Sequence, residues 1–187
     1  MTLVLALGDS ITAGSPLWDP AAESGDPTSQ YEHWAALKDP SLEFRNCGVY
    51  GERTDEIAAR LESCADGVEV LIVQGGINDI AQSRPVDPAA ENLRAMVQAG
   101  KERGLRVAIA ELLPWNNGYP QADPEIRRLN ELIHEVAGSE DVPVLPFYAT
   151  LEDDERLGRM RDEWTDDGDH PSIAGYRRLG ELAFRLP

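Results

Sequence analysis

The chain has 187 residues, 42% of them hydrophobic, so it is about one domain long and can bury a core. It carries 34 acidic against 17 basic residues, and a net charge of −17 repels nucleic acid and anionic membrane surfaces. No apolar stretch approaches the roughly 20 residues of a membrane-spanning helix. Residues 1–7 lack the basic start and long apolar run of a signal peptide, so we expect a cytoplasmic protein.

Strands and helices are expected to alternate along the chain. A short apolar or β-branched run closed by turn residues indicates a buried strand, and apolar residues three and four apart indicate a helix. On these patterns the sequence predicts strands at 3–7, 43–46, 68–74, 105–112 and 142–145. It predicts helices at 30–37, 53–64, 88–103, 124–137 and 172–184, with surface loops at 17–28 and 115–121.

Three of these helices have expected capping residues. Asp87 and Asp123 each precede a proline, which is favoured at the first helical position, and Ser172 is a favoured N-cap type. Gly138 is expected to end the helix that begins at residue 124.

Five strands alternating with helices favour a parallel sheet covered on both faces, which is a three-layer α/β/α sandwich. No internal repeat or linker divides the sequence, so residues 1–187 are expected to form a single domain. The oligomeric state cannot be inferred from these patterns.

The two cysteines, Cys47 and Cys64, form neither a disulfide framework nor a zinc pattern. We expect two buried or half-buried thiols, with a bridge between them left open.

Short polar groups and glycines follow the predicted strands. In an open parallel sheet, ligands bind outside the carboxyl ends of the strands. The segments delivered there are 8–10 after the first strand, 46–51 after the second, 75–79 after the third and 114–116 after the fourth. Chemistry is therefore expected at this edge.

Ser10 can act as a nucleophile only if a base activates it. Of the three histidines, His33 lies beside the first loop, and His134 lies in a helix away from its apolar stripe. His170 stands in a turn just before the last helix, with acids at 166, 167 and 169 that can orient an imidazole. An oxyanion hole also needs backbone N–H groups or a side-chain amide.

Four segments of the chain resemble, in order and rough spacing, the four blocks of the SGNH (GDSL-type) hydrolases. They are Gly8-Asp9-Ser10-Ile11-Thr12, Asn46-x-Gly48-x-x-Gly51, Gly76-x-Asn78-Asp79 and Asp167-x-x-His170-Pro171. They run from residue 8 to 171, so the resemblance covers nearly the whole chain. One block alone is a weak signal, but four in order at the predicted edge are a strong one.

The resemblance implies roles for individual residues. Ser10 would be the nucleophile, His170 the general base and then acid, and Asp167 the residue that orients the histidine. The backbone N–H groups of Ser10 and Gly51 and the amide of Asn78 would form the oxyanion hole. The resemblance further implies a flavodoxin-like fold, a small-molecule ester as substrate, and no metal or organic cofactor.

Some assignments have alternatives. Gly48 could replace Gly51, and Asp166 or Asp169 could replace Asp167. Asp79 is expected to stabilise its loop.

Each candidate also has a purely structural interpretation. Ser10 alone is typical of a helix N-cap, Asn78 of a turn and Gly51 of a positive-φ turn. The acids at 166–169 are typical of a solvated turn or a metal loop, although the full spacing of a calcium loop is absent. The non-catalytic alternative is a flavodoxin-like binding module with an incidental Ser–His pair.

The substrate is the least determined point. Tyr50, Trp115 and Trp164 are expected to line a pocket at the active edge, and Trp18 and Tyr119 lie near them. Aromatic faces suit sugar rings, aryl groups and acyl chains alike. Because there is no long apolar lid, we expect hydrolysis of short, acetyl-like esters of a carbohydrate or small alcohol. The alternatives are a lysophospholipase, a thioesterase or an acyltransferase that uses the same site.

Overall fold

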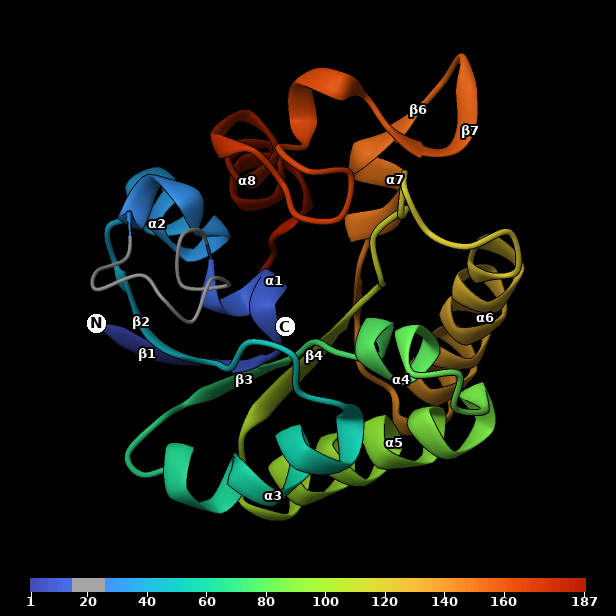
Figure 1. Cartoon of the computed structure of the whole chain (residues 1–187). Coiled ribbons are helices and arrows are strands. Elements are labelled where there is room, and N and C mark those ends of the chain that lie inside the picture. Colours follow the sequence, from blue (N-terminus) through green and yellow to red (C-terminus); the bar gives the residue numbers. More distant parts are fainter. Residues whose placement is uncertain (15–25) are drawn as a thin grey trace.

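The computed structural model describes residues 1–14 and 26–187 (Figure 1). Its central sheet has five parallel strands in the order β2-β1-β3-β4-β5. The strands are β1 (Thr2–Gly8), β2 (Leu42–Gly48), β3 (Val70–Val73), β4 (Arg106–Ala110) and β5 (Val144–Leu145). This is the flavodoxin-like order, in which the chain reverses direction across the sheet at β1 and β3. The predicted fold class is confirmed. Residues 17–25 of the first predicted loop, Trp18 included, lie outside the described residues.

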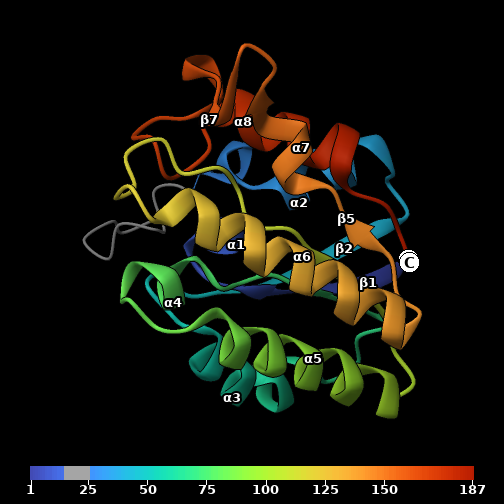
Figure 2. The same cartoon turned by 90° about the vertical axis from the view of Figure 1, so that its right-hand side faces the viewer.

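Helices cover both faces of the sheet because consecutive strand residues point to opposite sides. In β1, Leu5 and Leu7 join one core cluster, while Val4 and Ala6 join the other. The first cluster is completed by the helices α3 (Thr54–Cys64), α5 (Val86–Glu102) and α6 (Ala122–Glu140). The second is completed by α1 (Ser10–Ala13), α2 (Tyr31–Lys38), α7 (Phe147–Leu151) and α8 (Ile173–Arg178). Figures 1 and 2 show α3 and α5 on one side of the sheet, and α2 and α8 on the other.

Two predicted caps are wrong for the same reason. Asp87 and Asp123 lie inside the first turns of α5 and α6, whose N-caps are Pro85 and Gln121. The first N–H groups of a helix have no partner within it, so a proline is tolerated throughout the first turn and does not fix the first residue. The acids still sit near the positive end of the helix dipole.

The end of α6 is also later than predicted. The helix passes through Gly138 and ends at Glu140, before Asp141 in the left-handed region with φ 54°. Its last turn is held to α5 by Arg94, which donates to Ser139 Oγ at 2.8 Å, and by Gln98, which donates to Glu140 Oε1 at 2.7 Å. These tertiary contacts outweigh the low helix propensity of one glycine. The prediction that Ser172 caps α8 is confirmed, since its Oγ accepts from Gly175 N at 3.2 Å.

Several short elements have no counterpart among the predictions. They are the helices α1, α4 (Ile77–Ala81) and α7, the hairpin of β6 (Glu152–Asp153) and β7 (Arg156–Met160), and the 3₁₀ turns Pro27–Ser29 and Asp162–Trp164. The last helix continues from α8 as a π-helical turn, Leu179–Ala183. Elements of two to five residues are too short to show a hydrophobic period.

A disulfide joins Cys47, near the end of β2, to Cys64, the last residue of α3. The expectation of two thiols is therefore wrong in this structure, and the bridge that the sequence left open is present. It fastens α3 to the strand that leads toward Gly51.

Candidate active site

Ser10 is the first residue of α1, directly after β1. Asp9 caps this helix, because its Oδ1 accepts from Ile11 N at 2.9 Å. Burial raises the pKa of Asp9 to about 6, against hydrogen bonds from Ile11 and Gln74. Since Asp9 fills the capping role, the capping interpretation of Ser10 does not apply, and the Ser10 hydroxyl is available for another partner.

That partner is His170. Ser10 Oγ lies 3.0 Å from His170 Nε2, and both residues are buried, with exposed fractions of 5% and 7%. The other ring nitrogen, Nδ1, lies 2.7 Å from Asp167 Oδ2, whereas Asp169 Oδ2 is 3.8 Å away. Burial acts to raise the pKa of Asp167, but hydrogen bonds from the backbone and ring of His170 outweigh it and hold that pKa below its ordinary value. The geometry thus favours Asp167 over Asp169 as the partner of the imidazole.

The turn that carries His170 is fixed by its own hydrogen bonds. Thr165 Oγ1 donates to His170 O at 2.8 Å and accepts from Gly168 N at 2.8 Å. Gly168 has φ 86°, a conformation that glycine adopts without a steric cost. The loop after β4 braces the same turn, since Asn116 N donates to Gly168 O at 2.7 Å. The turn that carries His170 is therefore fixed both by its own hydrogen bonds and by the loop after β4.

The two candidate glycines after β2 have different surroundings. A Cβ at Gly48 would lie 2.1 Å from Ala13 N, and the Gly48 N–H donates to Asn46 Oδ1 at 2.9 Å. Gly48 is therefore needed for the close packing of α1 on β2. Gly51 has φ 76°, and among the described residues nothing would lie within 4 Å of a Cβ there. The Cα of Gly51 thus has open space on its side-chain side.

Asn78 lies in α4, directly beyond β3. Its Nδ2 donates to Glu52 O at 2.9 Å, so the amide is anchored next to Gly51. An amide nitrogen carries two hydrogens, so one can hold this loop while the other donates to a bound oxyanion. Asp79 has a different task, because it accepts from Thr54 N at 2.9 Å and from Thr54 Oγ1 at 3.0 Å. These bonds tie α4 to the start of α3.

A small cavity is lined by residues that are adjacent in sequence to Ser10 and Asn78. Ile11 and Ile77, adjacent to Ser10 and Asn78 in the chain, form part of its wall together with Trp115. Its volume is about 10 Å³, which is about the room that one water molecule needs. Tyr119 packs edge-on against Trp115, with ring centroids 5.9 Å apart.

The other two predicted pocket aromatics do not line this cavity. Tyr50 is 49% exposed in the turn before Gly51. Trp164 is only 9% exposed, and the guanidinium carbons of Arg161 and Arg178 lie 5.0 and 3.9 Å from its ring centroid. Both arginines stack on the indole, so Trp164 is a packing residue and its expected place in the pocket wall is not supported.

Gln74 holds the segment on either side of Ser10, and only one feature of the sequence points to it. Its buried Oε1 accepts from Asp9 N at 3.3 Å and from Thr12 Oγ1 at 2.8 Å. A Cβ at Gly8 would lie 2.4 Å from the same oxygen, so the glycine makes room for this bond. A polar residue at the end of a buried strand was the one available signal.

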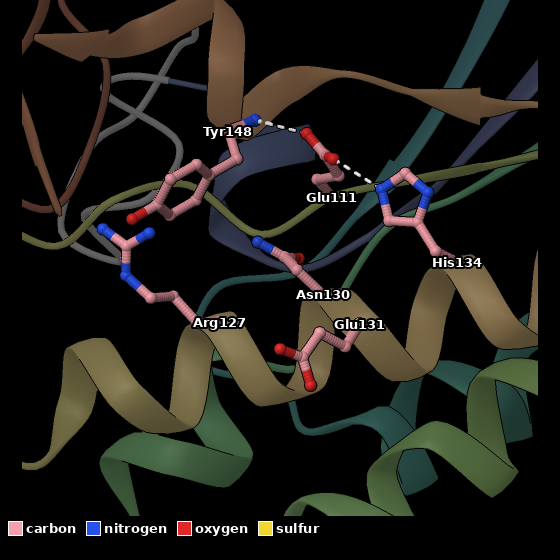
Figure 3. A pocket seen from close by; sticks show the side chains of 6 residues that line it. All are labelled: Glu111, Arg127, Asn130, Glu131, His134 and Tyr148. Carbon is pink, nitrogen blue, oxygen red and sulfur yellow. Dashed lines mark hydrogen bonds and ion pairs between the residues drawn. The ribbon is translucent and has the colours of Figure 1, made fainter. Parts of the chain in front are cut away.

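A separate hollow of about 450 Å³ lies beside α6 (Figure 3). His134 Nε2 is 2.7 Å from Glu111 Oε1, and Glu111 Oε2 accepts from Tyr148 N at 3.0 Å. The lining residues are Glu111, Arg127, Asn130, Glu131, His134 and Tyr148. No predicted site residue is among them, and the His134 side chain is 56% exposed, as its position on the helix predicts.

The sequence matches the model of the GDSL-like lipase/acylhydrolase family over residues 6–178. The chain belongs to this family. Family membership supports ester or acyl hydrolysis in general terms. No functionally curated protein matches the sequence significantly. No helix among the described residues is both long and apolar enough to cross a membrane.

Solved structures share the fold. A member of the lipolytic G-D-S-L family from Veillonella parvula superposes with a TM-score of 0.80 at 20% identity, covering 96% of this chain and 94% of its own. A lipase/acylhydrolase from Enterococcus faecalis gives 0.74 at 25%, covering 97% and 93%. An acetyl-xylooligosaccharide esterase from a Geobacillus species gives 0.76 at 18%, covering 96% and 90%.

Proposed function

We propose that this protein is a serine esterase that hydrolyses carboxylic esters through an acyl-enzyme. The observation that carries the proposal is the continuous hydrogen-bonded chain from Ser10 Oγ through the His170 ring to Asp167, with steps of 3.0 and 2.7 Å. In such a chain the imidazole accepts the hydroxyl proton, and the carboxylate fixes the tautomer and stabilises the imidazolium.

In the first half of the reaction, Ser10 Oγ attacks the ester carbonyl while its proton passes to His170 Nε2. The carbonyl oxygen becomes an oxyanion, which the N–H groups of Ser10 and Gly51 and the amide of Asn78 bind. These three groups follow β1, β2 and β3, on both sides of the point where the strand order reverses. When the tetrahedral intermediate collapses, the alcohol leaves with the proton from His170, and the acyl group stays on Ser10.

The second half repeats these roles with water. His170 removes a proton from a water molecule, whose oxygen attacks the acyl-enzyme carbonyl. The same oxyanion hole binds the charge, and collapse returns the proton to Ser10 Oγ and releases the carboxylic acid.

The substrate that fits this account is a short acyl ester of a carbohydrate or small alcohol. The cavity beside Ile11, Ile77 and Trp115 has room for about one water-sized group, which supports a short acyl group over a fatty acyl chain. An acetyl-xylooligosaccharide esterase has the same fold at 18% identity, which supports this substrate class. Lysophospholipase, thioesterase and acyltransferase activities remain outcomes of the test.

The test is hydrolysis of p-nitrophenyl esters from acetyl to palmitoyl by the wild type, Ser10→Ala and Ser41→Ala. Ser41 is a matched control, because it stands in the turn before β2 and its hydroxyl is paired with Asp39. We expect turnover to peak at acetyl or butyryl, to fall at least about 10³-fold in Ser10→Ala, and to persist in Ser41→Ala. Equal rates for wild type and Ser10→Ala contradict the proposal.

Two further outcomes would redirect the substrate assignment. A peak at long chains favours the lipid or thioester alternatives. Formation of a new ester when an acceptor alcohol is added, at the expense of free acid, favours acyl transfer.

A further inference from the structure

The guanidinium of Arg60, in the middle of α3, joins the strand ends that carry the proposed oxyanion hole. Its Nη2 donates to Gly8 O at 3.1 Å, two residues before Ser10, and its Nη1 donates to Cys47 O at 2.9 Å, near the end of β2. Its Nε and Nη2 lie 2.7 and 2.6 Å from Glu52 Oε2. The side chains of Arg60 and Glu52 are only 23% and 19% exposed, which strengthens these charge-assisted bonds.

Glu52 connects Arg60 to the third proposed oxyanion-hole donor, the side-chain amide of Asn78. It directly follows Gly51 in the chain, and its carbonyl oxygen accepts from Asn78 Nδ2 at 2.9 Å. Arg60 therefore fixes the segment before Ser10 directly, and it fixes both the Gly51 turn and the Asn78 amide through Glu52.

The regular sheet does not set these positions by itself. Pairing of β1 ends at Gly8–Gly48 on one side and at Leu7–Val73 on the other. Ser10, Gly51 and Asn78 all lie beyond these last rungs, so turns and side-chain bonds determine their spacing. A planar guanidinium has five donors in a rigid fork and can hold several oxygens at once, which a lysine ammonium does less well.

We propose that Arg60 is a positioning residue that sets the spacing of the three oxyanion-hole donors. The inference rests on the proposed function and deepens it, because Arg60 acts through Gly8, Cys47 and Glu52 and not on the reacting atoms. Donors stabilise an oxyanion only when they lie about 2.7–3.1 Å from it, and a misplacement of about 1 Å can cost about 10²-fold in rate.

The test compares Arg60→Lys and Arg60→Gln with Arg94→Gln in the full chain. Arg94 is a suitable control, because its side chain is 30% exposed and pairs with Glu91 and Glu140, away from the proposed site. Assays run well below each variant's measured Tm. We expect kcat to fall about 10- to 100-fold in Arg60→Gln, less in Arg60→Lys, and not in Arg94→Gln, with KM within about threefold throughout.

Two additional measurements separate positioning from plain stability. Millimolar guanidinium should restore part of kcat in Arg60→Ala. Glu52→Ala, which leaves the Arg60 bonds to both carbonyl oxygens in place, should lower kcat several-fold even if the Arg60 variants fold poorly. Unchanged kcat in Glu52→Ala, or a folded Arg60→Gln whose loss is confined to KM, overturns the inference.

Ser10→Ala, assayed in parallel, keeps the two proposals apart. If activity is lost in Ser10→Ala but kept in Arg60→Gln, only the role of Arg60 is overturned. If Ser10→Ala retains activity, the proposed function fails, and the Arg60 inference fails with it.

Discussion

Asp167 and His170 are joined by two hydrogen bonds, because Asp167 Oδ2 lies 2.7 Å from the ring Nδ1 while Oδ1 accepts from the His170 backbone N–H at 2.7 Å. One carboxylate thus fixes both the ring and the turn that carries it. The arrangement orients Nε2 toward Ser10 Oγ, 3.0 Å away. Asp167 therefore holds both the ring and the backbone of His170, whereas the Asp169 carboxylate lies 3.8 Å from the ring.

The first prediction follows from this pairing. Asp167→Asn should lower kcat by about 10³- to 10⁴-fold, because an amide favours the wrong tautomer of the imidazole and does not stabilise its charged form. Asp169→Asn, whose carboxylate is 3.8 Å from Nδ1, should have a much smaller effect. Steady-state kinetics on a short ester decide between them. A larger loss in Asp169→Asn would assign the orienting role to that residue.

The pH profile gives the second prediction. Hydrogen bonds from His170 hold the pKa of Asp167 below its ordinary value, so this carboxylate stays ionised as pH falls from 8 to about 5. The loss of kcat/KM toward acid should then come from the general base and not from Asp167, with a contribution from Asp9, whose pKa burial raises to about 6. A flat profile between pH 5 and 8 would argue against a histidine base.

Asn78 carries the third prediction. Asn78→Ala should lower kcat by about 10²- to 10³-fold with little change in KM, since it removes a donor to the transition-state oxyanion. Asn92→Ala is the matched control, because Asn92 lies in α5 and donates to Thr54 Oγ1. Equal kcat in wild type and Asn78→Ala would remove the amide from the proposed hole.

A buried acid behind the site gives the fourth prediction. Glu32 is 3% exposed, its Oε1 accepts from Asn46 Nδ2 at 2.9 Å, and burial raises its pKa from 4.5 to about 8. Between those pH values the folded chain keeps a proton that the unfolded chain releases. The stabilising contribution of the Glu32 carboxyl to the free energy of unfolding is therefore fully present below pH 4.5, and it is lost as pH rises toward 8.

Glu32→Gln stays neutral and still offers an oxygen to Asn46. Its unfolding free energy should exceed that of the wild type by a margin that grows by about 1–3 kcal/mol from pH 5 to pH 8. Glu131→Gln, at a side chain 67% exposed, should show no such trend. Thermal or urea unfolding at the two pH values measures the margin, and parallel stability curves for wild type and Glu32→Gln would contradict the buried-acid account.

The disulfide provides the fifth prediction. Cys47 and Cys64 are 17 residues apart, and closing a loop of this length stabilises a fold by about 3 kcal/mol. The variant with serine at both positions should lose stability of that order, and the unreduced protein should react with no thiol reagent. The cytoplasmic location expected from the absence of a signal-peptide pattern in residues 1–7 stays a prediction. The disulfide does not favour it, because disulfides persist mainly in oxidising compartments. Titration of two free thiols without reductant would show that the bond does not form.

The sequence predicts the three layers of this fold well, because the hydrophobic residues of its strands and long helices recur with a clear periodicity. Strands at 3–7 and 68–74 correspond to β1 and β3 within one or two residues at each end. Helix ends were less predictable, since contacts from α5 decide that α6 passes Gly138. The β6–β7 hairpin has strands too short for a pattern.

Some residues of the candidate site can be identified from the sequence, and others cannot. Ser10, Asp167 and His170 could be selected because nucleophile, base and acid have characteristic residue types, and the structure places them in one hydrogen-bonded chain. Arg60 has no such signal, because its partners are mainly backbone oxygens that any residue supplies. Trp164 was misplaced because an aromatic near an active edge can equally well be buried, here beneath two arginines.

The most direct test of the account is intact-protein and peptide mass spectrometry during turnover of a p-nitrophenyl acetate pulse. The account predicts that the wild type transiently gains one acetyl group, confined to the peptide that contains Ser10, and that Ser10→Ala gains none and releases no nitrophenol above the solvent rate. Hydrolysis without an acyl group on Ser10, or hydrolysis by Ser10→Ala at the wild-type rate, would contradict it.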